Sequence, residues 1–368
     1  MNIHKIHPER PLPDSGALAV GLNFQHEIYD FADTILKARA IRALESVAAK
    51  YPVYRWARRA SPRMLEAIFD DLALHSELSA YRFRIGSLLL EGPGVFVEAE
   101  GARTAEYSSC GFNIWADSVA RADEARERLF QLVGECYSPK QMFTLDWHFM
   151  DMRSGLNRTS FDELATDTIH DEAYPALEMP VHEFISRYLQ ASETVLVLLG
   201  APGTGKTRLV RTILGAMSER KGESARVMYT ADKRALENDE IFVDFITGSH
   251  DAFVIEDADH MLLARSNGNH DLHRFLAIAD GVVRAQGRKI IFTTNLPNVT
   301  DIDEALLRPG RCFASVRTRL LSRDEAALLL AKLDADAARH ESLLADLFAG
   351  TKSVSVADIY RACGKTLR

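Results

Sequence analysis

The stretch Gly200–Thr207, with the sequence GAPGTGKT, follows the apolar residues 195–199 and precedes a helical pattern at residues 207–217. It fits the pattern GxxxxGK[ST], in which glycines let backbone N–H groups turn inward around phosphate groups. Lys206 can reach the β- and γ-phosphates as a point charge, and the Thr207 hydroxyl can ligate Mg²⁺. A glycine-rich turn with an incidental lysine is the alternative. The strand before the stretch and the helix after it favour a phosphate-binding loop.

This loop supplies most of the residues that we expect to bind a nucleotide. The helix that follows adds the positive end of its dipole to the attraction for phosphate. The expected nucleotide-binding residues are Gly200, Ala201, Pro202, Gly203, Thr204, Gly205, Lys206, Thr207 and Arg208.

Strand and helix patterns alternate around this loop. Such alternation predicts an α/β fold, with a parallel sheet, helices on both faces and ligands at the carboxyl ends of the strands. The strand patterns lie at residues 195–199, 227–230, 252–255 and 290–294, and the helical patterns at 207–217, 239–246 and 272–285. Beyond residue 322 the pattern predicts a small helical lid, with helices at 324–333, 341–348 and 356–363.

The stretch AFVIEDADHM, residues 252–261, carries the second set of candidate residues. Four apolar residues lead into Glu256, Asp257 and Asp259. Two neighbouring acids alone can be a solvated turn. A phosphate-binding loop, however, requires a second strand that presents acids to Mg²⁺ and to the attacking water. Because this stretch follows the loop by about one βαβ unit, we expect it to be that strand.

Two later stretches add an amide and two arginines. The strand pattern in KIIFTTN, residues 289–295, ends at Asn295, which it could place between the acids and the γ-phosphate. In DEALLRPGRC, residues 303–312, Arg308 and Arg311 bracket a Pro-Gly pair and form a rigid basic corner. By itself such a corner is a solvated basic loop. At a subunit boundary it could insert a guanidinium into the nucleotide site of a neighbour.

These four stretches, in this order, resemble the AAA family of ATPases over about residues 170–365. GAPGTGKT resembles its Walker A motif, FVIEDAD its Walker B motif, TTN its sensor 1 and ALLRPGR its pair of arginine fingers. The resemblance implies ATP and Mg²⁺ as cofactors. The catalytic residues that it implies are Asp257, Glu256, Asn295, Arg308 and Arg311, and the metal ligands are Thr207 and Glu256.

The resemblance also implies roles for the acids and an assembly. Glu256 is expected to hold the coordination shell of Mg²⁺, and Asp257 to polarise the attacking water. Because aspartate is one methylene shorter than glutamate, we expect slow hydrolysis. Arginine fingers that act in a neighbouring subunit imply a homo-oligomeric ring, of six subunits as is usual in the family or of seven.

The order of the two acids narrows the resemblance. Most AAA proteins have Asp before Glu in Walker B, whereas this sequence has Glu256 before Asp257. The subgroup of the mitochondrial translocase of the Rieske iron-sulfur protein shares this order and includes rings of seven. Residues 228–246 and 272–283 also resemble segments of that subgroup.

Two further features bear on mechanism. AAA unfoldases grip a threaded chain with an aromatic–aliphatic–glycine loop, and neither Phe242 nor Phe245 precedes such a pair. With Ile241 and Ile246 they instead predict the buried face of a helix, which argues against threading of an extended chain. The stretch SVAD, residues 355–358, has valine where the sensor 2 motif of the family has glycine.

The first 150 residues predict an α+β domain that matches no family we can name, and its expected role is recognition of a protein partner. All three tryptophans, Trp56, Trp115 and Trp147, lie in it. Alternation places Asp146 and His148 on the polar face of one strand. The helical patterns lie at 31–50, 63–75 and 123–133, and the strand patterns at 81–90, 95–99, 111–116 and 143–149. The expected domains are 1–150, a linker at 151–174, the nucleotide-binding subdomain at 175–320 and the lid at 321–368.

Composition excludes some classes of protein. The 368 residues have 47% hydrophobic and 26% charged side chains and a net charge of −8, typical of a soluble globular protein and not of one with a wholly basic face. No stretch approaches the roughly 20 apolar residues of a membrane helix, and the first residues lack a signal-peptide core. The four cysteines form no CxxC pair. We therefore expect a cytoplasmic protein with no membrane segment.

Three functions are compatible with these patterns. The leading one is an ATP-driven remodeller or translocase of a protein partner. A nucleic-acid motor or loader is a second, for which YRWARRASPR at residues 54–63 is the one basic, aromatic cluster, although such a run is more often a solvated helix face. A third is a scaffold that assembles on ATP and turns over slowly.

Overall fold

The computed structural model describes residues 4–5, 53–84, 86–104, 106–153, 155–165, 168–263 and 287–365. The helices expected at 31–50 and 272–285 lie outside these ranges. The chain forms two compact units, residues 1–138 and 139–368, which are described separately. None of the described helices is long and apolar enough to cross a lipid bilayer.

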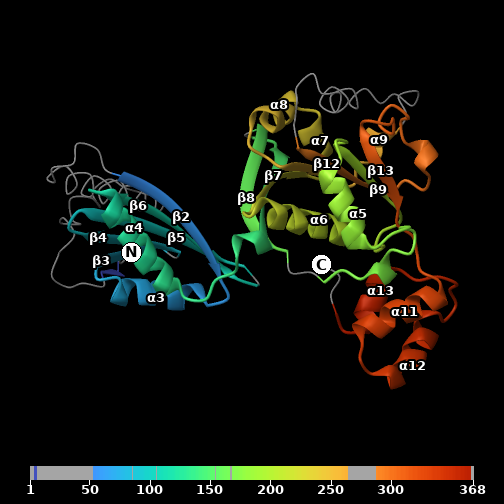
Figure 1. Cartoon of the computed structure of the whole chain (residues 1–368), viewed down its shortest axis with the longest axis horizontal. Coiled ribbons are helices and arrows are strands. Elements are labelled where there is room, and N and C mark those ends of the chain that lie inside the picture. Colours follow the sequence, from blue (N-terminus) through green and yellow to red (C-terminus); the bar gives the residue numbers. More distant parts are fainter. Residues whose placement is uncertain are drawn as a thin grey trace. The chain divides into compact units, whose positions relative to one another are not determined.

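The first unit is an antiparallel sheet with two helices on one face (Figure 1). In the described residues the strand order is β1-β3-β4-β5-β6-β2. The helices cover a core of alternate strand residues such as Val97, Phe112 and Ile114, all fully buried. The elements are β1 (His4–Lys5), β2 (Val53–Ser61), α3 (Leu65–His75), β3 (Ser79–Arg84), β4 (Ser87–Gly92), β5 (Val95–Arg103), β6 (Ser108–Ala116) and α4 (Val119–Val133).

The basic stretch at residues 54–63 is not the helix face that the sequence favoured. Most of it forms β2, which pairs with β6 over its whole length, from Val53 opposite Ala116 to Ser61 opposite Ser108. The alternation of a strand puts Trp56 outside at 60% exposure and Ala57 inside at 7%. Aromatic residues such as Tyr54 and Trp56 are enriched in strands, where they fit the half-buried surface of a sheet.

The second unit contains the parallel sheet that the sequence predicts, flanked by helices on both faces, so the expected α/β fold is confirmed. The strand order is β13-β9-β12-β11-β10-β7-β8. Its strands are β7 (Met142–Asp151), β8 (Gly155–Leu164), β9 (Val195–Leu199), β10 (Ala225–Thr230), β11 (Ala252–Ile255), β12 (Lys289–Thr294) and β13 (Cys312–Arg317). Around this sheet, the helices in the described residues are α5 (Val181–Gln190), α6 (Lys206–Lys221), α7 (Lys233–Leu236), α8 (Asp239–Thr247) and α9 (Asp259–Leu262).

The boundary between the two units lies before β7, not at residue 150. β7 pairs in parallel with β10, and β8 pairs antiparallel with β7, so this hairpin extends the nucleotide-binding sheet. The segment expected as a linker at 151–174 therefore contains β8. Backbone pairing with a strand some 80 residues later is a long-range contact that periodicity does not report.

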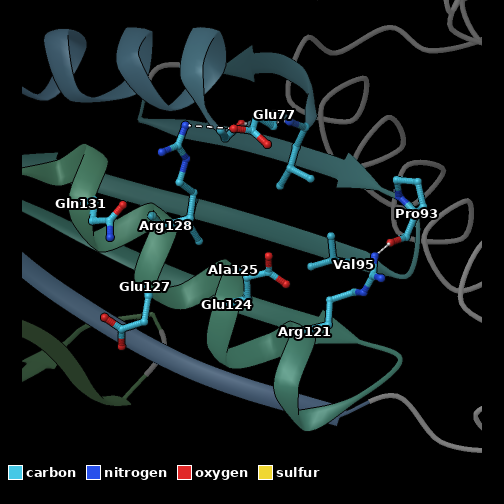
Figure 2. Close-up of a pocket in the computed structure, with 12 residues that line it drawn as sticks. Glu77, Pro93, Val95, Arg121, Glu124, Ala125, Glu127, Arg128 and Gln131 are labelled. Carbon is cyan, nitrogen blue, oxygen red and sulfur yellow. Dashed lines mark hydrogen bonds and ion pairs between the residues drawn. The ribbon is translucent and has the colours of Figure 1, made fainter.

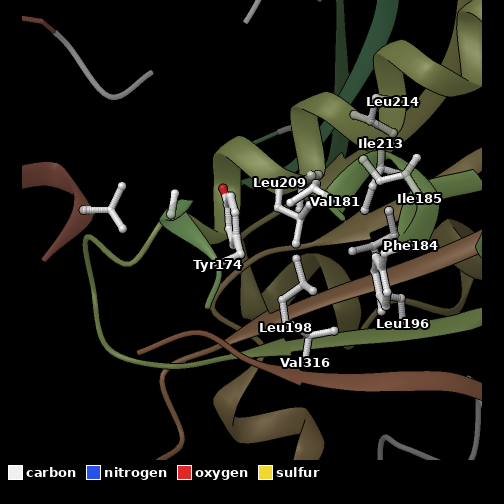
Figure 3. Close-up of a cluster of buried hydrophobic side chains, with 14 of the residues drawn as sticks. Tyr174, Val181, Phe184, Ile185, Leu196, Leu198, Leu209, Ile213, Leu214 and Val316 are labelled. Atoms are coloured by element: carbon white, nitrogen blue, oxygen red, sulfur yellow. The ribbon is translucent and has the colours of Figure 1, made fainter. Parts of the chain in front are cut away.

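Burial on both faces explains why the strand before the loop is wholly apolar. In β9, Leu196 and Leu198 pack in the core that includes α5 and α6 (Figure 3), and Val195 and Val197 pack in the core that includes α8. All are fully buried. A parallel strand covered on both sides has no polar face.

Three helices form the lid, as expected: α11 (Arg323–Leu333), α12 (Ala337–Leu347) and α13 (Val356–Ala362). Ser322 and Glu325 form a capping box that starts α11, and Ser355 and Asp358 form one that starts α13. Each box satisfies backbone N–H groups of the first turn that have no partner within the helix.

α8 also agrees with the sequence analysis. Ile241, Phe242 and Phe245 are buried, and the ring of Phe245 lies 5.3 Å from that of Phe253. These aromatics belong to the core and are not displayed on a loop, which confirms the predicted buried helix face.

Candidate nucleotide-binding site

The loop between β9 and α6 requires glycine at three of its positions. At Gly200, with φ at 149°, a Cβ atom would lie 2.1 Å from the carbonyl oxygen of Thr318. Gly203 and Gly205 have φ angles of 77° and 93°, in the left-handed region that other residues rarely adopt. A Cβ atom at Gly205 would lie 2.9 Å from the Tyr174 hydroxyl, and one at Gly203 would lie 3.1 Å from the Ser355 hydroxyl. The loop is thus packed between Tyr174 and the start of the lid helix α13.

Lys206 is the first residue of α6 and lies largely inside the site, with 8% exposure. Its Nζ donates to the carbonyl oxygen of Gly200 at 2.5 Å and to Asn295 Oδ1 at 3.0 Å. Burial lowers the pKa of Lys206, and the neighbouring carboxylates of Asp257, Asp259 and Glu256 oppose that effect. The ammonium is held where the loop, β11 and β12 converge.

Glu256 has both carboxylate oxygens occupied by hydroxyl donors. Thr207 Oγ1 donates to Oε1 at 2.8 Å, and Tyr229 Oη donates to Oε2 at 2.8 Å. Burial and the adjacent Glu256 raise the pKa of Tyr229, so this phenol remains a donor. The sequence analysis did not single out Tyr229, although its position near the carboxyl end of β10, beside β11, could have drawn attention to it.

Asp257 adopts a backbone conformation that is rare for a residue with a side chain, with φ at 51°. Its N–H donates to Thr293 Oγ1 at 3.2 Å, and Asn295 Nδ2 donates to its Oδ1 at 3.0 Å. Contacts from β12 therefore hold the residue in place. Such conformations persist where the surroundings over-determine them, and they are common at active sites.

Asp259 connects the ends of the same two strands. Its Oδ1 accepts from the backbone N–H of Asn295 at 2.8 Å and from Thr294 Oγ1 at 2.5 Å. This third acid fixes the backbone on which Asn295 stands. Nothing in the sequence around Asp259 indicated this role.

The two arginines of the basic corner lie in different environments. Arg308 is exposed, and its side chain forms no ion pair with any residue that the structure describes. Arg311 is half-buried, and its Nη1 donates to the carbonyl oxygen of Ala305 at 2.7 Å. The structure thus brings Arg311 into its own loop and does not bring Arg308 to the nucleotide-binding loop of the same chain.

The lid touches the nucleotide-binding loop directly. The N–H of Ala357, in α13, donates to the carbonyl oxygen of Gly203 at 3.0 Å. Arg208, expected at the nucleotide, is buried beside the lid, with its guanidinium 4.6 Å from the centre of the Tyr360 ring. It also donates to the carbonyl oxygen of Thr168 at 2.9 Å.

The residues present fit a magnesium nucleotide. Thr207 and Glu256 supply hydroxyl and carboxylate oxygens, the ligand type that Mg²⁺ prefers, and the loop supplies N–H groups and Lys206 for phosphate. Within the described ranges, no group of three or more His, Cys, Asp and Glu side chains could hold a metal ion by itself. Such a group is not required for Mg²⁺ that is bound through one or two protein ligands and the oxygens of the phosphates.

A phosphate-binding loop after β9, acids after β11 and an amide after β12 define a nucleotide triphosphatase with a parallel sheet. Residues 196–320 match the model of the ATPase family associated with various cellular activities (AAA). This part of the chain is therefore similar to the ATPase domains of the AAA family.

Known relatives of the chain agree with this class. The chain is 25% identical over 227 residues to a vesicle-fusing ATPase of Caenorhabditis elegans, covering 55% of this chain and 26% of that protein. It is 25% identical over 309 residues to the peroxisomal ATPase PEX6 of Cricetulus griseus, covering 78% and 28%. It is 30% identical over 176 residues to a 26S proteasome regulatory subunit 6B homolog of Aspergillus niger, covering 42% and 40%. The matched part of the chain thus spans between about a quarter and two fifths of the length of each relative.

A second polar cluster lies under α8 and corrects one expectation. Asp146 and His148 do not lie on a solvated face: both are buried, and Trp147 between them is 43% exposed. His250 Nε2 lies 2.8 Å and Arg226 Nη2 lies 2.9 Å from Asp146 Oδ2. Partners from later in the chain satisfy the polar atoms of β7, so their burial is tolerated.

This cluster perturbs its titratable groups. Burial lowers the pKa of His250, although Asp146 opposes the shift. Burial raises the pKa of Asp146, but hydrogen bonds from Ser160 and His250 together with Arg226 outweigh it and lower the pKa. His250 is therefore neutral and Asp146 ionised at neutral pH.

Proposed function

We propose that the protein is an AAA ATPase that couples ATP binding and hydrolysis, in a homo-oligomeric ring, to the remodelling or translocation of a protein partner. The observation that carries the proposal is the convergence of Lys206, Thr207, Glu256, Asp257 and Asn295 at the carboxyl edge of one parallel sheet. These side chains come from the ends of β11 and β12 and from the start of α6, and together they supply the groups that phosphoryl transfer to water requires.

Each residue has a distinct role in this proposal. The loop N–H groups and Lys206 bind the phosphates, and Thr207 and Glu256 hold Mg²⁺. When bound, Mg²⁺ supplies charge neutralisation on the phosphate oxygens. Asp257 accepts a hydrogen bond from the attacking water and polarises it, while Asn295 Nδ2 fixes the Asp257 carboxylate.

The exposed Arg308 supports a ring. A guanidinium without an ion-pair partner among the described residues, carried on a Pro-Gly corner, is suited to enter the site of a neighbouring subunit. Arg311, tied to Ala305, shapes that corner. We propose six or seven subunits, with one active site at each subunit boundary.

The first unit is the proposed recognition domain. A cavity of about 500 Å³ lies between α4 and the turns that follow α3 and β4 (Figure 2). Val95 and Leu129 line it together with charged side chains, of which Arg121 and Arg128 bridge its ends to Pro93 and Glu77. A mixed apolar and charged lining suits a segment of polypeptide. The relatives include a vesicle-fusing ATPase and a 26S proteasome regulatory subunit 6B homolog, whose names refer to vesicle fusion and to the proteasome.

Two features support a position near the Rieske protein translocase subgroup. Glu256 precedes Asp257 in this sequence. The aromatic residues of α8 pack in the core and leave no aromatic loop there to grip a threaded chain. We propose that the protein moves a partner without threading it as an extended chain.

A nucleic-acid motor is the second candidate, and one observation favours it. β2 displays Tyr54, Trp56 and Arg58 on the face opposite the helices, and the ring of Tyr54 lies 5.6 Å from that of Trp115. Exposed aromatics beside a guanidinium can stack on unpaired bases. Tight binding of a single-stranded oligonucleotide, weakened steeply by salt, would favour this candidate over protein remodelling.

Asp257→Asn tests the proposed chemistry. Because the amide keeps the shape and the contact with Asn295 but loses the negative charge, we expect turnover to fall by about 10²-fold or more with ATP affinity retained. The measurements are steady-state phosphate release and equilibrium binding of ATP. Lys206→Ala is the contrasting variant and should lose ATP binding itself. Normal hydrolysis by Asp257→Asn would refute the assignment of the water-polarising acid.

A further inference from the structure

Tyr229 is connected to the proposed magnesium site through one hydrogen bond. It stands on β10, the strand next to β11, and its hydroxyl lies 2.8 Å from Glu256 Oε2. The backbone around it is fixed, because Tyr229 pairs with Val254 and the N–H of Glu256 donates to the carbonyl oxygen of Thr230 at 3.0 Å. The phenol thus approaches the carboxylate from a rigid element.

The two carboxylate oxygens of Glu256 each accept a hydrogen bond from a different hydroxyl group. Thr207 Oγ1, from the nucleotide-binding loop, takes Oε1, and Tyr229 takes Oε2. A glutamate side chain has three rotatable bonds, and holding it in one rotamer costs conformational entropy. The hydrogen bond from Tyr229 to Glu256 Oε2 restricts the side chain before a metal binds, and it leaves Oε1 directed at Thr207. Less conformational entropy is then lost when the metal binds.

We propose that Tyr229 is a positioning residue, which orients Glu256 for Mg²⁺ and so sets the magnesium affinity of the ATP-bound enzyme. The inference rests on the proposed function, because it gives Tyr229 a role only through Glu256. Tyr229 itself touches neither ATP nor the metal. Hydrogen bonds to an ionised acceptor are stronger than those between neutral groups, so this contact is energetically significant.

Tyr229 also contacts the β7–β8 hairpin, which extends the sheet beyond β10. Trp147 of β7 is the register partner of Tyr229, and the two rings meet edge to face with centroids 6.5 Å apart. A shift of the Tyr229 ring on magnesium binding would therefore change the surroundings of the Trp147 indole. The fluorescence of Trp147 can therefore report on the contact between Tyr229 and Glu256.

Tyr229→Phe removes the hydroxyl and keeps the ring. We expect the Mg²⁺ concentration for half-maximal ATPase activity to rise roughly three- to tenfold, with a lower kcat, while ATP binding in EDTA is unchanged. Magnesium-free binding depends on the loop and not on the orientation of Glu256. A purely structural role of Tyr229 would lower thermal stability without moving the magnesium midpoint.

Tyr188→Phe is the matched control. Tyr188 is a fully buried tyrosine whose hydroxyl donates to the carbonyl oxygen of Thr194 at 2.9 Å, away from the carboxyl edge of the sheet. Its variant should lose stability and keep the wild-type magnesium midpoint. Tyr229→Leu, which also removes the ring, should match Tyr229→Phe in magnesium midpoint while losing more stability.

A second measurement uses a protein with Trp56→Phe and Trp115→Phe, in which Trp147 is the remaining tryptophan. We expect its fluorescence to change more with ATP and Mg²⁺ than with ATP and EDTA, and Tyr229→Phe to remove that difference. An unchanged or lower magnesium midpoint in Tyr229→Phe, with an active wild type, would overturn the role of Tyr229 alone. A wild type that binds ATP but shows no magnesium-dependent hydrolysis would overturn the proposed function and this inference together.

Discussion

Arg308 and Arg311 lie three residues apart on one basic corner, yet their surroundings assign them different tasks. Arg311 bonds within its own loop, and Arg308 extends from it into solvent. The sequence predicted two equivalent fingers, because residue type and spacing do not report which guanidinium finds a carbonyl group nearby. Only the path of the loop through space separates them.

Arg308→Ala should leave ATP affinity and thermal stability unchanged and reduce turnover by about 10³-fold or more, since a finger stabilises charge that develops in the transition state. Arg311→Ala should instead lower the free energy of unfolding by about 1 kcal/mol, through the lost bond to Ala305. Phosphate release, ATP binding and thermal melting distinguish the two.

Mixing variants tests whether the finger acts in a neighbour. An Arg308→Ala subunit retains a complete nucleotide site, and a Lys206→Ala subunit retains the finger. If the finger acts between subunits, the mixture should recover part of the activity that each variant lacks. No recovery on mixing would place the action of Arg308 within its own chain.

At the scale of the element, the β7–β8 hairpin departs most from what the sequence indicated. Periodicity correctly identified a strand at residues 143–149 but assigned Asp146 and His148 to its polar face. In the structure both side chains are buried. Arg226 and His250 contact the Asp146 carboxylate and offset the unfavourable free energy of its burial. Alternation locates a strand, and its neighbours decide which face is covered.

The cluster around Asp146 predicts acid sensitivity of this hairpin. The pKa of His250 is lowered in the folded protein, so below about pH 6.5 the unfolded chain binds the proton more readily and stability falls as the pH falls. The lowered pKa of Asp146 acts in the same direction, since its contribution is present above about pH 4 and lost below it. His148, Asp244 and Arg226 surround the same side chains.

Urea unfolding between pH 7.5 and pH 5 measures this effect. His250→Gln retains a donor for Asp146 but cannot titrate, so its unfolding free energy should fall less over that interval than that of the wild type. Equal slopes for the two proteins would mean that other groups control the acid response. His340→Gln, at a histidine of the lid that bonds to the carbonyl oxygen of Asp334, is the control and should keep the wild-type slope.

At the scale of the whole molecule, the proposed function predicts that the protein assembles into a ring when ATP is bound. Asp257→Asn with ATP and Mg²⁺ should assemble into particles of six or seven times the protomer mass, because bound ATP persists at each boundary. Lys206→Ala, which should not bind ATP, is the control and should remain smaller under the same conditions. Mass photometry measures both, and a monomeric Asp257→Asn saturated with ATP would contradict the ring.

The resemblance carried by GAPGTGKT, FVIEDAD, TTN and ALLRPGR was sufficient for the AAA class, because phosphate binding imposes local chemistry that short motifs record. It was also sufficient for the parallel sheet and the lid, whose periodic patterns are strong. The first 150 residues had no such motif. There the strand at residues 53–61 was missed, since an alternating run with three arginines also fits an exposed helix face.

The sequence by itself determined the glycine-rich loop after β9, the pair of acids after β11 and the alternation that builds the sheet, because each depends on residues close together in the chain. Tertiary structure alone decided that Tyr229 holds Glu256, that Asp259 holds the strand bearing Asn295, and that β7 belongs to the ATPase sheet. These contacts join residues about 30 to 80 positions apart. Their geometry follows from how parallel strands align at one edge, which is a property of the folded sheet and not of any one segment.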